Sequence, residues 1–152
     1  MDLKDKILSS YVAFENEMDM NSDIHEIRMK SLEKFEKLGF PSKKLEEWKY
    51  TSLNTVLKND YSLFPNKEVS VDLADVKKYF IHDIDSYKVV FIDGKYNSFL
   101  SETTHDTIDV CLMSAALTKP KYKIVIENYF NKIAKQDNLT SLNTAFAKEG
   151  SY

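Results

Sequence analysis

The chain has 152 residues, a length typical of one domain, and its 43% apolar and 30% charged residues exclude a disordered chain. A net charge of −3 and a single arginine, Arg28, argue against a surface that binds nucleic acid or an anionic membrane. The lone cysteine, the lack of a signal-peptide pattern and the lack of an apolar run of about 18 residues predict a cytoplasmic protein.

Residues 2–19 are predicted to form an amphipathic helix with Asp2 as its N-cap. Its apolar residues recur at steps of three or four, which places them on one face. They are Leu3, Ile7, Tyr11, Phe14 and Met18.

A second helix is predicted to follow, because Asp23 and Glu26 have the spacing of a capping box. Gly39 can take the left-handed conformation that ends a helix, and Pro41 prevents its continuation. The short polar connection predicts an antiparallel helical hairpin over residues 1–40. The apolar stripe of the second helix contains Ile24, Ile27, Leu32, Phe35 and Leu38.

Residues 41–152 are predicted to form a small mixed α/β part, so the expected fold class is α+β. A short helix is expected at residues 72–80. After it, two β-rich runs flank Asp93-Gly94, the strongest short signal for a β-hairpin. The run "DTIDVCLM", residues 106–113, predicts a further strand.

Two more helices are predicted near the end of the sequence. The first covers residues 122–135, and its expected buried side consists of Val125, Ile126, Tyr129, Phe130 and Ile133. The second begins with Ser141 as N-cap and stops at Gly150. Because the sequence ends directly after this stop, we expect the chain to be one domain of a longer protein.

The residues that could carry chemistry do not form a recognisable site. Cys111 lies in the apolar run 106–113, where a buried thiol is favoured over a nucleophile, which needs a nearby histidine and an exposed, electropositive setting. The segment "HDID", with His82, Asp83 and Asp85, can be drawn as a metal site but is more typical of a solvated loop.

Other site patterns are missing as well. Glu46 and Glu47 are adjacent on an expected helix, so their side chains diverge and make a poor acid/base pair, which must flank one reacting centre. The three glycines stand too far apart for a phosphate-binding loop, and there is no zinc-ligand spacing. We therefore expect no catalytic, cofactor-binding or metal-binding residue in this chain, and no enzymatic activity.

Three segments resemble the N-terminal region of the SufB/SufD family of iron–sulfur cluster assembly proteins. They follow one another in the order of the family at family-like spacing, and the resemblance extends over the whole chain. The first is "GFPSKKLEEWKYTSL", matched by Pro41, Glu47, Trp48, Lys49, Tyr50 and Thr51; the second is "VVFIDGKYNSFLS", matched by Val90, Asp93, Gly94, Leu100 and Ser101; the third is "SLNTAFAKEGSY", matched by Leu142, Asn143, Ala145, Phe146 and Gly150.

The resemblance implies that residues 1–152 are the N-terminal domain of a SufD-like protein, with SufD favoured over SufB by the helical hairpin before Trp48. Such a protein continues into a β-helix and a C-terminal helical region, both absent from this chain. These regions pair with SufB and dock the ATPase SufC, so the partners SufB and SufC are expected to bind mostly outside this chain. The implied function is a non-catalytic scaffold module without its own cofactor, nucleic-acid partner or membrane contact.

The resemblance also gives Trp48 a structural role. A tryptophan can bury about 200 Å² and still donate its indole N–H, so we expect it to be largely buried and to anchor its segment. Two alternatives stay open: a stand-alone small cytoplasmic enzyme that uses "HDID" or Cys111, and an unrelated protein-interaction domain.

Overall fold

A computed structural model of the chain describes residues 1–17, 23–64, 70–102, 108–132 and 135–147. These residues form two compact units, one within residues 1–65 and 127–148 and the other within residues 66–126. Helices predominate over one pair of short strands, which agrees with the predicted α+β class. None of the described helices is long and apolar enough to cross a membrane.

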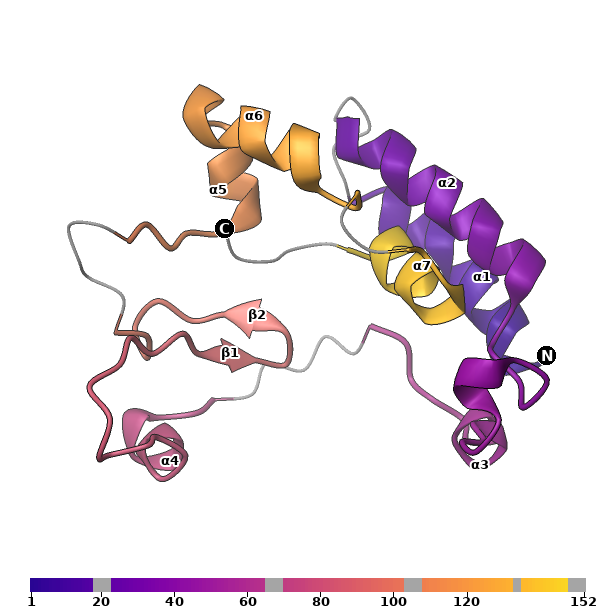
Figure 1. Cartoon of the computed structure of the whole chain (residues 1–152), viewed down its shortest axis with the longest axis horizontal. Helices are drawn as coiled ribbons and strands as arrows, with labels where there is room; N and C mark the ends of the chain where they lie inside the picture. Colours follow the sequence, from indigo (N-terminus) through magenta and orange to yellow (C-terminus); the bar gives the residue numbers. More distant parts are fainter. Residues whose placement is uncertain (18–22, 65–69, 103–107, 133–134, 148–152) are drawn as a thin grey trace. The chain divides into compact units, whose positions relative to one another are not determined.

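The first unit combines helices from opposite ends of the sequence. Its elements are α1 (Leu3–Glu15), α2 (Asp23–Leu38), the single-turn 3-10 helix η1 (Glu46–Trp48), α3 (Asn54–Leu57) and α7 (Asn138–Ala145). Helices α1 and α2 run in opposite directions, and α7 lies against α2 (Figure 1). The connection between α1 and α2 lies outside the described residues, as does Met18 of the predicted stripe.

Helix α1 begins as the sequence predicts. The side chain of Asp2 accepts a hydrogen bond from the backbone N–H of Asp5 at 2.8 Å, which satisfies one of the free donors of the first turn. Tyr11 and Phe14 are buried, and they form a core cluster together with Ala145 of α7. The predicted apolar face of α1 is therefore confirmed at these two positions.

The most extensive contact between two elements is that of α2 with α7. Ser31 on α2 and Ser141 and Ala145 on α7 are fully buried, and such small side chains allow two helices to approach closely. The predicted division after residue 40 separates α7 from α1 and α2, but this contact places α7 in the same unit as both helices.

The buried face of α2 differs in part from the predicted stripe. It consists of Ile24, Arg28, Ser31 and Phe35, at steps of four, three and four residues. Leu38 is 48% exposed, so its predicted burial is wrong. This face contacts α7 and includes the polar residues Arg28 and Ser31. A search for apolar periodicity does not detect polar residues on a buried face.

Helix α2 ends as predicted at Gly39, whose φ of +63° is the left-handed conformation. Its N–H donates to the carbonyl of Phe35 at 2.7 Å. The ring of Phe40 meets the ring of Phe35 edge to face at 5.2 Å. The side-chain amide of Asn138 donates to the carbonyls of Leu38 (3.2 Å) and Gly39 (2.7 Å), so α7 also satisfies acceptors at the end of α2.

The N-cap of α7 is Asp137 and not the predicted Ser141. The Asp137 carboxylate accepts the N–H of Thr140 at 2.8 Å, and the Thr140 hydroxyl accepts the N–H of Asp137 at 2.7 Å. This capping box starts the helix four residues earlier and buries Ser141 inside it. The hydrogen bonds from Thr140 hold the pKa of Asp137 below its usual range. The predicted stop, Gly150, lies outside the described residues.

The second unit contains short elements. They are α4 (Leu73–Lys77), β1 (Phe91–Ile92), β2 (Lys95–Tyr96), α5 (Met113–Leu117) and most of α6 (Pro120–Tyr129). Helix α4 starts with a capping box between Asp72 and Asp75, but it ends before the predicted Phe80. Leu73, at its first position, is 40% exposed.

Strands β1 and β2 pair antiparallel, with Phe91 opposite Tyr96. Asp93 (φ 48°) and Gly94 (φ 79°) connect them, and both have the positive φ that a type I′ turn requires. An isolated bridge between Lys88 and Glu102 extends the pairing, while each strand itself is only two residues long.

Two predictions for the second unit are wrong in the described residues. Residues 108–112 of the expected strand 106–113 belong to no strand, and α5 begins at Met113. Helix α6 starts at Pro120 and ends at Tyr129, before the expected residue 135. Its buried residues are Tyr122 and Ile126, one turn apart, whereas Val125 and Tyr129 are exposed.

A pair of serine substitutions tests the α2–α7 packing. The Ser141 hydroxyl is buried without a hydrogen-bond partner, whereas the Ser31 hydroxyl accepts from Gln136 Nε2 at 3.1 Å. Ser141→Ala should raise the free energy of unfolding, because it removes a desolvated hydroxyl and alanine favours helix. Ser31→Ala should be less stable than Ser141→Ala by about 1 kcal/mol, because only it loses a hydrogen bond. Urea unfolding of both variants measures the difference, and equal stabilities would contradict the packing.

A substitution of Gly94 tests the turn between β1 and β2. No atom lies within 4 Å of a Cβ built at Gly94, so a substitution there acts through its backbone conformation. Gly94→Val should lower the free energy of unfolding by about 1–2 kcal/mol, because a β-branched residue is strained at positive φ. Gly94→Asn is the control, since asparagine tolerates this conformation. The thermal unfolding midpoints should rank the wild type and Gly94→Asn above Gly94→Val.

Candidate functional site

The residues that the sequence singles out for chemistry do not come together. Cys111 is a free, partly buried thiol on the segment before α5, so the expected fully buried strand position is wrong. His82, Asp83 and Asp85 are exposed between α4 and β1. Within the described parts of the chain, no group of three or more His, Cys, Asp or Glu side chains is placed to hold a metal ion.

The other ionisable candidates have neighbours that account for their positions. His25 lies on α2, where its Nε2 is 3.6 Å from Oε1 of Glu15, within range of an ion pair but too far for a hydrogen bond. Glu46 binds Lys49 at 3.0 Å on η1, and Glu47 is exposed. His105 lies outside the described residues. Glu46 and Glu47 thus share a single 3-10 turn and not the predicted longer helix.

An apolar depression of the first unit lies between α1 and α7 and is here called the α1–α7 groove. Its volume is about 340 Å³, within the range of small ligand sites. One wall is α1, the second is α7 and the third is the segment 63–64. The lining residues are Ile7, Ser10, Leu63, Phe64, Leu139, Leu142, Asn143 and Phe146.

A cluster of aromatic rings forms the inner side of the α1–α7 groove. The ring of Phe64 stacks on Phe14 at 5.6 Å and on Phe146 at 5.5 Å between centroids. Phe146 also meets Tyr11 edge to face at 5.4 Å. Such pairs stabilise beyond the area that they bury, so the segment with Phe64 is fastened to both helices.

Phe64 holds this position in a strained backbone conformation. Its φ is +51°, which is unusual for a residue with a side chain, and the next residue in the sequence is a proline, which restricts it further. The ring remains 51% exposed although it stacks on two others. The aromatic contacts thus offset the strain and keep one face of Phe64 open to solvent.

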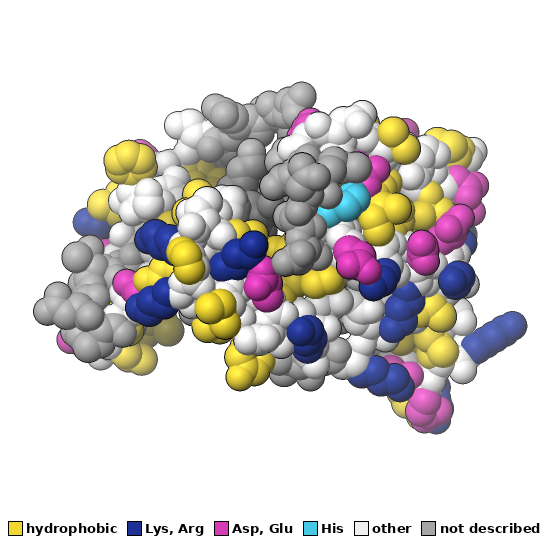
Figure 2. Space-filling view, turned by 90° about the horizontal axis from the view of Figure 1, so that it is seen from above, with side chains coloured by type: hydrophobic (Ala, Val, Ile, Leu, Met, Phe, Trp, Pro, Cys, Tyr) yellow, Lys and Arg dark blue, Asp and Glu magenta, His cyan; other side chains and the backbone are white. Residues whose placement is uncertain are grey.

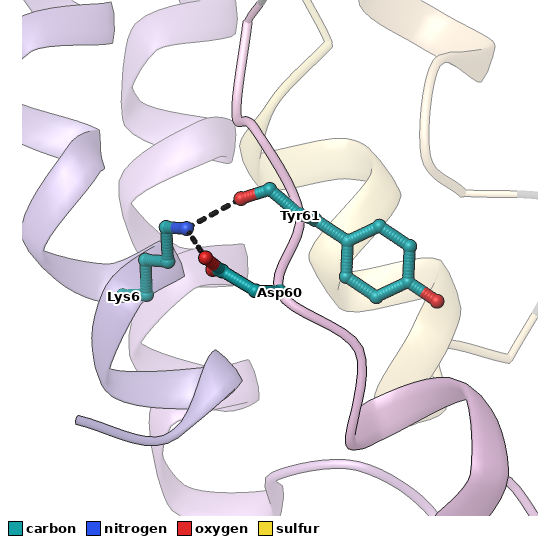
Figure 3. Close-up of polar contacts among 3 residues, drawn as sticks. All are labelled: Lys6, Asp60 and Tyr61. Carbon is teal, nitrogen blue, oxygen red and sulfur yellow. Dashed lines mark hydrogen bonds and ion pairs between the residues drawn. The ribbon is translucent and has the colours of Figure 1, made fainter.

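Lys6 ties the same segment to α1 (Figure 3). Its Nζ donates to Oδ1 of Asp60 at 2.6 Å and to the carbonyl oxygen of Tyr61. The hydrogen bond from Lys6, followed by its positive charge, holds the pKa of Asp60 below the usual range of an aspartate. Together with Phe64, this contact positions residues 60–64 as the third wall of the α1–α7 groove.

The chemistry of the α1–α7 groove favours binding over catalysis. Its only polar side chains are Ser10, whose hydroxyl donates to the carbonyl of Ile7 at 2.7 Å, and Asn143, which is exposed. No ionisable side chain is among its lining residues, so the groove offers no group for proton transfer. The groove can provide apolar contacts, and the side-chain amide of Asn143 can orient the bound group.

A second depression, here called the 41–54 hollow, lies where the two ends of the segment 41–54 meet. Its volume is also about 340 Å³. It is lined by Pro41, Ser42, Lys43, Lys44, Ser52, Leu53 and Asn54. Between these ends the chain passes through η1, on which Trp48 is partly buried and Tyr50, just beyond, is 88% exposed. Trp48 therefore lies outside the buried core, and its expected burial is only partly met.

Comparison with protein families identifies the family of the chain. A family model described as the SufBD protein N-terminal region matches residues 1–152. The chain belongs to this family. Membership connects it to the SUF system of iron–sulfur cluster assembly, and the resemblance inferred from the three segments is confirmed. The match is to the shared SufBD family, so the choice of SufD over SufB stays a prediction. A search of curated proteins found no match.

The structure gives several residues of the family-like segments a place in packing, in the groove lining or in a turn. Ala145 is fully buried, and Leu142, Asn143 and Phe146 line the α1–α7 groove. Gly94 sits at the turn between β1 and β2. Sequence reasoning missed the α1–α7 groove because its walls are about 130 residues apart along the chain; only the aromatic character of Phe64 and Phe146 hinted at a shared cluster.

The ion pair of Lys6 with Asp60 gives a test of the groove wall. Lys6→Met removes the donor and the charge, so the pKa of Asp60 should rise to that of an ordinary aspartate. Because the pKa is depressed in the folded wild type, the contact stabilises the wall above the usual aspartate pKa and is lost as the pH falls. Carboxyl NMR titration of both proteins measures the shift, with Asp2→Asn as a control that leaves Asp60 unchanged. The same Asp60 pKa in both proteins would refute the contact.

Proposed function

We propose that this chain is a non-catalytic scaffold module of the SUF machinery, and that it belongs to a SufD-like subunit of a SufBCD complex in the cytoplasm. The observation that carries the proposal is the match of the SufBD N-terminal family over residues 1–152. The family gives the process, which is iron–sulfur cluster assembly. The subunit, its partners and its scaffold role are inferred from that process and from the surface chemistry.

The surface chemistry supports binding over catalysis. The α1–α7 groove is lined by apolar and aromatic side chains and lacks an ionisable group. The thiol of Cys111 is a single ligand, whereas a cluster held by protein thiolates usually needs several. On the face shown in Figure 2, basic and acidic side chains are interspersed, which favours contact with proteins over contact with a nucleic-acid backbone.

The proposed partners are SufB and SufC, reached mostly through regions of the parent protein outside this chain. A module of this kind contributes a folded surface to an assembly that other subunits supply with cluster ligands and ATPase activity. Preference for SufD over SufB rests on α1 and α2, which precede the Trp48 segment as two helices of opposite direction (Figure 1).

Deletion of residues 1–152 from the parent protein tests the scaffold role. Affinity capture of the truncated parent should still recover SufB and SufC, because their main contacts lie elsewhere. Cluster assembly by the purified complex should fall, because the module's surface is missing. A complex that assembles clusters at an unchanged rate without residues 1–152 would refute the proposal.

The non-catalytic part of the proposal has its own test. Anaerobic incubation of the chain with iron and sulfide should give no stable cluster absorption, since Cys111 alone cannot hold a cluster. Cys111→Ser should give the same spectrum as the wild type. A stable absorption band that disappears in Cys111→Ser would instead assign Cys111 as a cluster ligand and contradict the proposal.

A further inference from the structure

The 41–54 hollow has a different chemistry from that of the α1–α7 groove. Its rim carries two lysines and two serines, and no aspartate or glutamate lines it. We propose that the 41–54 hollow is a binding site for an oxyanion, either a phosphate or a carboxylate group of a small molecule. This inference does not depend on the proposed scaffold function.

The positive charge at this site is not neutralised by the protein. Lys43 and Lys44 are exposed, and neither forms an ion pair or a side-chain hydrogen bond within the described structure. Lys49 of the same segment differs, because it is paired with Glu46 at 3.0 Å. Glu46 is therefore taken up by Lys49, and within the described structure no carboxylate forms an ion pair with Lys43 or Lys44.

The serine hydroxyls add neutral donors. Ser42 Oγ accepts the N–H of Lys44, and Ser52 Oγ accepts the N–H of Asn54, each at 3.3 Å. A hydroxyl that accepts in this way keeps its own proton, and in the described structure neither hydroxyl donates to a protein group. Both protons can therefore be donated to an anion. A hydrogen bond to an anion is stronger than one to a neutral acceptor.

Backbone hydrogen bonds hold the two ends of the hollow. The N–H of Leu45 donates to the carbonyl of Ser42 at 3.0 Å, and the N–H of Thr51 donates to the carbonyl of Trp48 at 3.0 Å. These turns fix both ends of the segment. Pro41 is buried and Leu53 is partly buried, so the hollow has an apolar side that lowers the local dielectric and strengthens the attraction of an anion to the lysines.

The size of the hollow sets the class of ligand. At about 340 Å³ it exceeds the space of one phosphate or carboxylate group, so it accepts the group together with part of the molecule that carries it. Two lysines and two hydroxyls match the several oxygens of such a group, and the apolar side of Pro41 and Leu53 can contact the carbon skeleton.

The direct test is an NMR titration of the chain with inorganic phosphate and, separately, with citrate at constant ionic strength. We expect saturable shifts of the backbone N–H signals of Ser42, Lys44, Ser52 and Asn54. A larger affinity for citrate would assign a carboxylate ligand, and a larger affinity for phosphate would assign a phosphate ligand. Shifts that do not saturate, or that spread over all lysine-rich surfaces, would overturn the proposal.

Three variants separate a built site from general attraction by positive charge. Lys43→Gln/Lys44→Gln should bind the better probe at least about tenfold more weakly. Lys77→Gln/Lys78→Gln changes the net charge equally at exposed residues of the other unit and should bind as the wild type does. Ser42→Ala/Ser52→Ala keeps all charges, loses both hydroxyl donors and should also bind more weakly.

The fold of each variant is checked by circular dichroism and thermal unfolding. If the variant Lys43→Gln/Lys44→Gln fails to fold, the variant Ser42→Ala/Ser52→Ala still tests the site, because it keeps the charge of the segment. Equal affinity of the wild type and both hollow variants would refute the site. An equal loss in Lys77→Gln/Lys78→Gln would also refute it, by assigning the binding to net charge alone.

Discussion

The first unit depends on the packing of α2 against α7, two helices about 100 residues apart in the sequence. Closing so long a loop costs conformational entropy, which the contact must offset. Buried Phe35 and Ala145 contribute apolar area, and the Asn138 amide satisfies carbonyls at the end of α2. Because α7 also forms a wall of the α1–α7 groove, that groove exists only when the distant helix has docked.

Polar side chains hold much of this interface in register. The Nε of Arg28 donates to the carbonyl of Ala147 at 2.7 Å, and Gln136 donates to Ser31 and to Asn131. Burial lowers the pKa of the Arg28 guanidinium, and its nearest carbonyl partner offsets part of that desolvation. Hydrogen bonds of this kind specify one alignment of two helices, whereas apolar contacts alone permit several. The unpartnered hydroxyl of Ser141 is the exception within the interface.

Local signals in the sequence predicted local structure well. Asp2 as a cap, Gly39 as a helix end and Asp93-Gly94 as a turn are each specified by a few neighbouring residues. The errors arise where distant contacts decide. Periodicity in apolar residues could not place Arg28 and Ser31 on the buried face of α2, since their burial depends on partners near residues 136–147. Likewise, Ser141 has the composition of a cap, but Asp137 and Thr140 form a complete capping box earlier.

Several residues of the family-like segments have structural roles. Ala145 and Phe146 pack in the core cluster, and Gly94 supplies a backbone conformation. Residues with such structural roles specify the fold, and a fold by itself does not define a reaction. Function must then lie in surfaces that packing does not use. Two such surfaces have defined chemistry here: the apolar α1–α7 groove beside Asn143, and the 41–54 hollow with its unpaired lysines. Their different linings suit different ligands, an apolar group in the first and an anion in the second.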